Sequence, residues 1–276
     1  MNRSRFRLRS VLFHLIALAI AVLFILPFYW ALVISLRAPG LPPPRTVAWW
    51  PAAPHWSNYA EIFRVVPMGL YLGNSLLVVA VAVPVTLAVS SLAGFGIAQL
   101  GSRWRRRLVV FSIVLLMIPG VAVWTFRFHV LNWLGLVDSL WALIAPAFAG
   151  SSPLFVLLFY WTYFRVPAEI YESARLDGAG IWAVWWRIAQ PLAWPTTAVV
   201  AMLTFALYWS DFSSPVLYIF NPARYTVAVG LQILRQMDAT NYPLLMAGAV
   251  VMFAPVVVFL ALVQRYFLRD WGVGDW

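Results

Sequence analysis

Six long apolar runs dominate this chain of 276 residues. A helix that crosses the hydrocarbon core of a bilayer needs about 20 mostly apolar residues, and only helices and closed barrels satisfy their backbone polar groups there. Hydrophobic residues make up 63% of the chain and charged residues 10%, whereas soluble domains are about 45–50% apolar. The sequence therefore predicts an all-α integral membrane protein with six transmembrane helices. The predicted spans are Val11–Leu36, Leu70–Leu100, Leu108–Phe126, Leu140–Phe164, Pro191–Phe220 and Pro243–Phe267.

The distribution of basic residues predicts the orientation of these spans. All 19 basic residues are arginines, and arginine is enriched in cytoplasmic loops. With the N-terminus inside, the segments 1–10, 99–107, 164–190 and 265–276 hold 13 of the 19. Both termini are therefore predicted to be cytoplasmic. The arginines of these loops account for much of the net charge of +10. We therefore expect the chain to contact a lipid bilayer and not to bind nucleic acid. The first run is too long for a signal peptide, and we expect it to be retained.

Missing residue types exclude several kinds of site. The chain has no cysteine, so a thiol nucleophile or a cysteine metal site is impossible. It has no lysine, so the phosphate-binding loop of an ATPase is also impossible, and any ATP hydrolysis must come from another chain. His14, His55 and His129 lie far apart in the sequence. We therefore predict no metal, no cofactor and no catalytic residue.

One polar segment, Pro167–Pro195, interrupts the apolar runs on the predicted cytoplasmic side. Proline suits a helix start, and the helix that begins at Pro167 should end near Asp177, because Gly178 and Gly180 follow. A second short helix is then predicted. Its apolar residues recur at helical spacing and form one stripe. The stripe consists of Ile181, Val184, Trp185 and Ile188. By pattern alone, insertion into a groove on a cytoplasmic partner and resting on lipid are about equally supported.

The spacing within this segment resembles a known motif. Glu172-Ser173-Ala174, three residues, Gly178, nine residues, then Ile188 and Pro191 resembles the EAA motif of ABC importer permeases. Asp177-Gly178-Ala179 is similar to the form common in carbohydrate importers. The sequence departs from the pattern at Ser173, where alanine is usual, and at Gln190, where leucine usually precedes the proline.

The resemblance extends over most of the chain, from about Asn58 to the sixth span. It is similar to the maltose-type permeases of binding-protein-dependent importers. The matching segments are Asn58-Tyr59 with Phe63, Asn74-Ser75-Leu76, Met117-Ile118-Pro119, Leu134–Ser139, Trp209-Ser210-Asp211 and Tyr225–Leu231.

The resemblance implies a type I ABC importer permease for a sugar or oligosaccharide, in a bacterial or archaeal plasma (inner) membrane. Residues 1–276 would form a single transmembrane domain, with a core of about 70–267 and a coupling loop of about 165–190. That loop would carry the coupling helix, between spans four and five, which docks in a cleft of an ATPase subunit. The implied coupling residues are Glu172, Ser173, Ala174, Asp177, Gly178, Ile188 and Pro191. Implied partners are a pair of ATPase subunits, a second homologous permease subunit in a heterodimer, and an extracytoplasmic solute-binding protein.

Three residues are candidates for the substrate pathway: Asn74, Trp209 and Asp211. An ionisable residue within a span usually faces a cavity or a partner, so Asp211 could hydrogen-bond substrate hydroxyls. Alternatively, Asp211 could be in contact with water near the outer end of the fifth span and have a structural role, which is the interpretation that we favour slightly. Asn74 could line the pathway or join helices by hydrogen bonding.

Two other functions stay open. The first is an ABC permease for glycerol phosphate or another polyol-like solute. The second is a membrane-embedded enzyme acting on lipid-linked sugar, which would need clustered acids at the membrane face. The only cluster of acids lies in the EAA-like segment, and its spacing fits docking better than catalysis.

Overall fold

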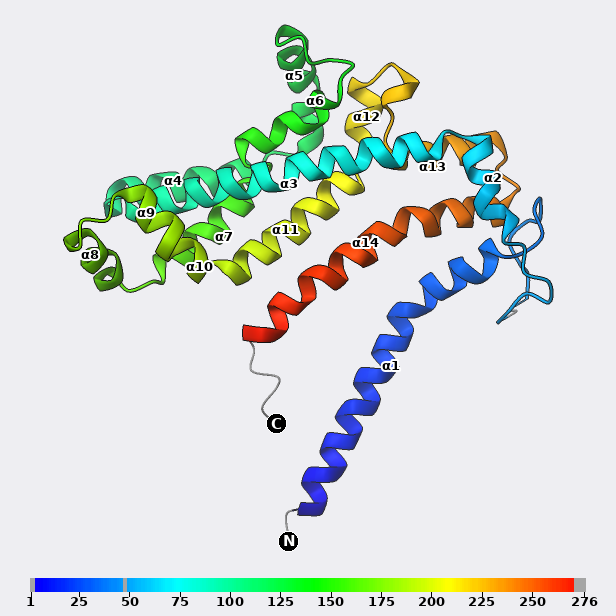
Figure 1. Ribbon diagram of the computed structural model, residues 1–276, viewed down its shortest axis with the longest axis horizontal. Coiled ribbons are helices and arrows are strands. Elements are labelled where there is room, and N and C mark those ends of the chain that lie inside the picture. The colour runs from blue at the N-terminus through cyan, green and yellow to red at the C-terminus, as the bar shows by residue number, and fades with distance from the viewer. Residues whose placement is uncertain (1–2, 47–48, 271–276) are drawn as a thin grey trace. The chain divides into compact units, whose positions relative to one another are not determined.

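A computed structural model describes residues 3–46 and 49–270, and within these ranges the chain is helical with no β-strand (Figure 1). Four helical stretches are long and apolar enough to cross a membrane, so the prediction of a multi-pass membrane protein is confirmed. They are α1 (Arg3–Ser35), α3 (Met68–Gln99), the stretch Leu140–Phe164 and α14 (Tyr242–Asp270). The stretch Leu140–Phe164 is made of α6 (Leu140–Ile144), η1 (Ala145–Ala149) and α7 (Pro153–Phe164).

Two further candidate spans are sharply bent. Helix α4 (Ser102–Leu116) meets α5 (Gly120–Trp133) at 98°, and Ile181–Leu192 meets α11 (Trp194–Trp209) at 81°. The described residues thus hold four to six spans, six if each bent pair counts as one. Pro119 has an extended conformation with ψ of 130° at the first break, and proline disfavours helix in the residue before it. The span predicted over Leu108–Phe126 is therefore broken at Pro119.

The predicted fifth span is also divided. Helix α11 begins at Trp194, with a proline in its first turn, and it ends at Trp209 instead of continuing to Phe220. Three residues then separate it from α12 (Ser213–Tyr218). The shorter elements are α2 (Ser57–Val65), α8 (Ala168–Leu176), α9 (Ile181–Val184), η2 (Trp185–Ala189), α10 (Gln190–Leu192), η3 (Pro222–Arg224) and α13 (Val227–Met237).

The chain forms two compact units. The first contains residues 1–68 and 230–254. In it, the buried Asn58 of α2 donates from Nδ2 to the carbonyls of Ser35 (2.7 Å) and Arg37 (2.8 Å). These carbonyls lie at the C-terminus of α1, where a helix has no partners of its own. Tyr59 adds a hydrogen bond between its hydroxyl and Ser35 Oγ, so α2 caps the end of α1.

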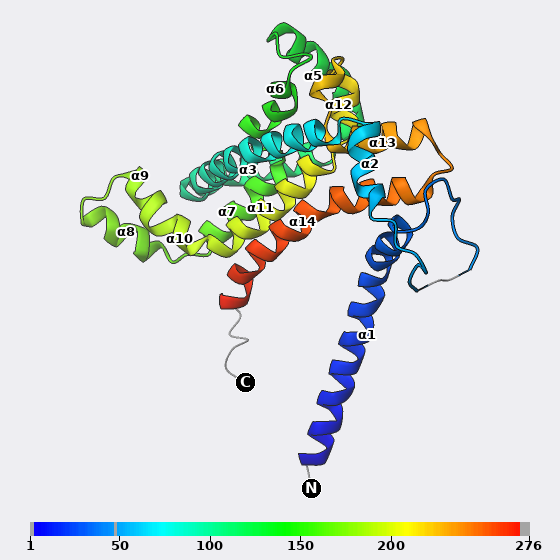
Figure 2. The same ribbon diagram turned by 45° about the vertical axis from the view of Figure 1, so that its right-hand side comes forward.

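The second unit contains residues 69–229 and 255–276, and its core lies where α3 passes α7. A Cβ built on Gly94 would lie 2.7 Å from both Phe159 Cβ and the Tyr160 backbone nitrogen. The two backbones can approach this closely only because Gly94 has no side chain. In both views of the molecule, α8 and α9 lie at one end of α7, and α5, α6 and α12 lie toward its other end (Figures 1 and 2).

Replacing Gly94 with alanine should lower the melting temperature of the purified protein in detergent. The new methyl group would meet backbone atoms, which cannot move aside, and overpacking of this kind costs about 1–3 kcal/mol. Gly96 lies two residues along the same helix, and a methyl group added there would have nothing within 4 Å. Gly96→Ala should be neutral or slightly stabilising, since alanine gains about 1 kcal/mol of helix propensity. Equal melting temperatures for the two variants would contradict the close approach.

Candidate functional site

The polar segment forms the helix, turn and second helix that the sequence predicts. Helix α8 follows Pro167 and ends at Leu176, with Asp177 as its C-cap. Gly178 has φ of +84°, a conformation that is costly for residues with a Cβ. The Ala179 N–H then donates to the Ala174 carbonyl at 2.9 Å. This closure of the helix end is of the Schellman type, and it reverses the chain into α9.

One face of α8 packs against the core of its own chain. Tyr171 and Ala174 are buried, and the Tyr171 ring meets Phe95 of α3 edge-on at a centroid distance of 6.0 Å. Tyr171 also donates to the Tyr163 carbonyl of α7 at 3.3 Å. Arg175 donates to Oε1 of Gln99, the last residue of α3, at 2.6 Å. Helix α8 is thereby bound to the ends of both long helices, and Ala174 lies on this inner side.

The opposite face of α8 and the turn after it are exposed. Glu172, Ser173 and Asp177 are exposed there, and neither carboxylate forms an ion pair with any other residue that the structure describes. Leu176 is 88% exposed, which is unusual for a leucine unless the surface meets lipid or another protein. Sequence reasoning missed Leu176, although its position four residues after Glu172 places both on one helix face. We call Glu172, Ser173, Leu176 and Asp177 the outer face of α8.

The predicted apolar stripe of the second helix is only partly correct. Val184 belongs to a cluster of buried apolar side chains, and Trp185 and Ile188 pack against that cluster. Ile181, in contrast, is 54% exposed. Ile181 is the first residue of α9 and lies before the π-helical turn at Trp185–Ala189. This turn inserts an extra residue into the helix, and Ala189 at its end is fully buried.

Gln190 stands at the centre of a buried polar network. Its Oε1 accepts from Ser91 Oγ (2.7 Å) and the Tyr163 hydroxyl (2.8 Å), and its Nε2 donates to Thr197 Oγ1 (3.1 Å). The Trp185 indole donates to Ser91 Oγ at 3.0 Å. These residues come from α3, α7, η2, α10 and α11. Gln190, at the position where the motif usually has leucine, therefore joins α10 to α3, α7 and α11 by hydrogen bonds. Pro191 follows at the surface of the same turn.

Replacing Gln190 with leucine, the residue of the resembling motif, should lower the melting temperature in detergent. The hydroxyls of Tyr163 and Thr197 would each lose a partner in a buried setting, at a cost of about 1–3 kcal/mol. Gln236→Leu is the matched control, because Gln236 is exposed on α13. A leucine variant as stable as the native protein would show that the network contributes nothing.

A cavity of about 410 Å³ lies at the C-terminal end of α11. Its wall combines hydroxyl groups, three aromatic side chains, one carboxylate and one guanidinium. The lining residues are Trp124, Arg127, Leu143, Pro146, Ser151, Leu207, Tyr208, Ser210, Asp211, Phe212, Ser213 and Ser214. Such a wall can hydrogen-bond a hydroxylated solute and stack against its apolar face.

The structure brings one of the three predicted pathway residues to this cavity. Asp211 lines it, and its Oδ1 also accepts from the Ser214 N–H at 3.0 Å. Trp209 is 2% exposed and stacks on Phe205. Asn74 donates to the carbonyls of Ala223 and Tyr225, both at 2.9 Å. Arg127 also lines the cavity. It was not among the candidates for the substrate pathway that the sequence predicted.

Asp138 fixes two loops beside this end of the unit. Its Oδ1 accepts from the N–H groups of Phe220 (2.9 Å) and Asn221 (2.8 Å), and Arg224 donates to its Oδ2 at 2.9 Å. The two backbone hydrogen bonds, followed by the charge of Arg224, lower the pKa of Asp138 below the usual value. The loop between α5 and α6 is thereby attached to the chain after α12.

We expect Asp138→Asn to have a lower melting temperature than the native protein at pH 6. A lowered carboxylate pKa stabilises the fold fully above the unfolded pKa of about 3.9, and this contribution is lost as pH falls through the folded pKa. The difference between the two proteins should therefore begin to shrink below about pH 4 and vanish as pH falls through the lowered pKa of folded Asp138. Asp177→Asn is the control, because Asp177 forms no ion pair within the described residues. A difference that persists unchanged into acid would rule out the charge of Asp138 as its cause.

Comparisons with known proteins complete the description of the site. Residues 87–272 match the family described as "Binding-protein-dependent transport system inner membrane component". The chain is 27% identical to the sulfoquinovosyl glycerol transport system permease protein of Agrobacterium fabrum, over 87% of this chain and 84% of the relative. It is 31% identical to the maltodextrin transport system permease protein of Bacillus subtilis, over 74% and 75%.

One further relative and one solved structure are also similar to this chain. The identity is 30% with the arabinooligosaccharides transport system permease protein of Halalkalibacterium halodurans, over 79% of this chain and 77% of the relative. A solved bacterial ABC transporter that imports the acidic polysaccharide alginate contains a chain with a TM-score of 0.76, at 17% identity, over 97% of this chain and 99% of that one. At this identity the match establishes the fold.

Proposed function

The chain belongs to the family of inner-membrane components of binding-protein-dependent transport systems, and from this membership we propose that it is the permease subunit of an ABC importer for an oligosaccharide or related sugar. The resemblance drawn from the motif spacing is confirmed by the family match. The observation that carries the proposal is the outer face of α8, an exposed acidic and apolar surface on a helix bound to two spans. The family is a transport component, so a membrane enzyme acting on lipid-linked sugar is not supported.

The proposed solute class rests on the relatives and on the cavity at α11. The relatives' names give maltodextrin, arabinooligosaccharides and sulfoquinovosyl glycerol as their solutes, all of them rich in hydroxyl groups. The cavity volume of about 410 Å³ lies in the range of small-molecule sites, about 300–1,000 Å³. Asp211 and the serine hydroxyls supply polar partners, and Trp124 supplies a ring face. A polyol-like solute remains compatible with the same wall.

Coupling would work through the two faces of α8. The outer face would dock on a separate ATPase subunit, with Glu172 and Asp177 meeting basic side chains and Leu176 filling an apolar pocket. Tyr171, Ala174 and Arg175 on the inner side would pass the movement of the ATPase to α3 and α7. Gly178 would set the turn, Ile188 would seat the second helix on the chain's core, and Pro191 would lie at the surface where that helix leads into α11.

The complete importer would contain further subunits. We propose a pair of ATPase subunits, a second homologous permease subunit and an extracytoplasmic solute-binding protein, in a bacterial or archaeal plasma (inner) membrane. The binding protein follows from the family description. In this arrangement residues 1–276 act as one permease domain with both termini and α8 on the cytoplasmic side.

The double variant Glu172→Ala/Leu176→Ala tests the docking role. Interface hot spots contribute about 2 kcal/mol or more, so co-purification with the ATPase subunit should weaken by about thirtyfold. Solute-stimulated ATP hydrolysis by the reconstituted importer should be lost while membrane insertion stays intact. The control is Glu61→Ala/Phe63→Ala, which removes one acid and one exposed apolar residue from α2. Normal assembly and normal hydrolysis in the Glu172 and Leu176 variant would refute the proposal.

A further inference from the structure

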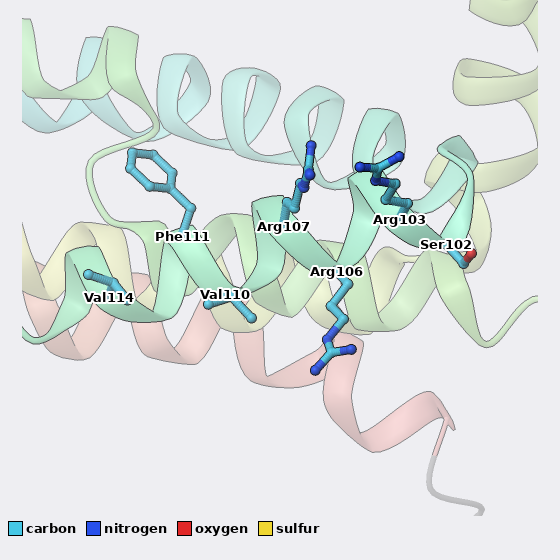
Figure 3. A pocket seen from close by; sticks show the side chains of 7 residues that line it. All are labelled: Ser102, Arg103, Arg106, Arg107, Val110, Phe111 and Val114. Carbon is cyan, nitrogen blue, oxygen red and sulfur yellow. The ribbon is translucent and has the colours of Figure 1, made fainter.

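Helix α4 carries a groove along most of its length, separate from the cavity at α11 and from the outer face of α8. Its volume is about 920 Å³, and all its lining side chains come from this one helix (Figure 3). They combine three arginines and a serine with three large apolar residues. The lining residues are Ser102, Arg103, Arg106, Arg107, Val110, Phe111 and Val114.

The groove lies between two rows of side chains spaced four residues apart, as expected for a helix surface. One row is Ser102, Arg106, Val110 and Val114, and the other is Arg103, Arg107 and Phe111. In the close view, Arg103, Arg107 and Phe111 extend to one side of α4, and Arg106 extends to the other (Figure 3). Both rows change from polar or cationic to apolar in the same direction along the helix.

The charges of this groove are not neutralised by the chain. Arg103, Arg106 and Arg107 form no ion pair within the described parts of the chain. Arg107 lies over the ring of Trp104, 5.0 Å from its centroid, which is a cation–π arrangement. Arg105 differs from the other three, because it is half-buried and its guanidinium lies over the ring of Phe164, 4.5 Å from the centroid. Three of the four clustered arginines are therefore available to an anion.

The apolar half of the groove is equally open. Phe111 is 58% exposed, and Val110 and Val114 are each 51% exposed. A soluble anion could satisfy the arginines but would leave these three side chains uncovered. A molecule with a phosphate at one end and hydrocarbon at the other would cover both halves at once. Clusters of arginine beside a membrane attract anionic lipid headgroups.

We propose that this groove binds an anionic phospholipid of the surrounding bilayer. The phosphate group is held by Arg103 and Arg107, which extend to the same side of α4. An acyl chain lies along Val110, Phe111 and Val114, in the direction in which α4 runs toward its break at Pro119. The site is independent of the sugar cavity and of the outer face of α8, so it stands whether or not the proposed solute is correct.

The test is binding of phosphatidylglycerol and phosphatidylcholine to the whole chain in a non-ionic detergent, measured by native mass spectrometry. The native protein should prefer phosphatidylglycerol. Arg103→Gln/Arg107→Gln should reduce its affinity for phosphatidylglycerol by about thirtyfold, because each arginine near an anionic lipid contributes about fivefold. The matched control is Arg165→Gln/Arg187→Gln, which removes the same charge from two exposed positions outside the groove and should bind as the native protein does. Circular dichroism and gel filtration confirm that both double variants are folded.

A second variant tests the hydrocarbon half. Phe111→Ser should weaken phosphatidylglycerol binding several-fold while leaving binding of glycerol 1-phosphate, the headgroup alone, unchanged. Equal affinity of the native protein for glycerol 1-phosphate and phosphatidylglycerol would overturn the proposal in favour of a soluble-phosphate site. Unchanged lipid affinity in Arg103→Gln/Arg107→Gln, with loss of ATPase co-purification instead, would overturn it in favour of a protein contact.

Discussion

The close contact of α3 with α7 at Gly94 is the constraint on which the second unit depends. It brings Phe95 beside Tyr163 and Tyr171, with ring centroids 5.6 and 6.0 Å apart. Lipid is as apolar as a leucine side chain, so helices in a membrane associate through such close packing and through hydrogen bonds, with little help from the hydrophobic effect. Because Tyr171 belongs to α8, the same contact that joins two spans also fixes the polar helix at their ends.

Hydrogen bonds add to the packing contacts that join the helices in this region. Gln190 joins α3, α7 and α11 through Ser91, Tyr163 and Thr197, and Arg175 joins α8 to Gln99 at the end of α3. The helices behind the outer face of α8 are therefore joined to one another by hydrogen bonds.

The sequence predicted the features that depend on local residue types. The end of α8 at Leu176 and the positive φ of Gly178 follow from glycine placement, and the long apolar runs follow from composition. The 98° break at Pro119 and the π-helical turn at Trp185–Ala189 did not follow, because several prolines lie in apolar runs and only tertiary packing decides which one breaks a helix. The network around Gln190 was missed for a related reason. Its members lie up to 106 residues apart between Ser91 and Thr197, and no local pattern joins them.

The interruption between α11 and α12 explains where polar groups gather in the second unit. A helix that ends inside a membrane leaves backbone N–H and C=O groups without partners, and these must be satisfied by protein or by a water-lined cavity. The break after Trp209 is followed by Asp211, whose carboxylate accepts from the Ser214 N–H at the start of α12. The cavity of about 410 Å³ opens at this same break, with Arg127 of the bent helix α5 in its wall. The interrupted helix and the polar cavity thus belong to one arrangement, in which irregular backbone is stable because it lines a cavity.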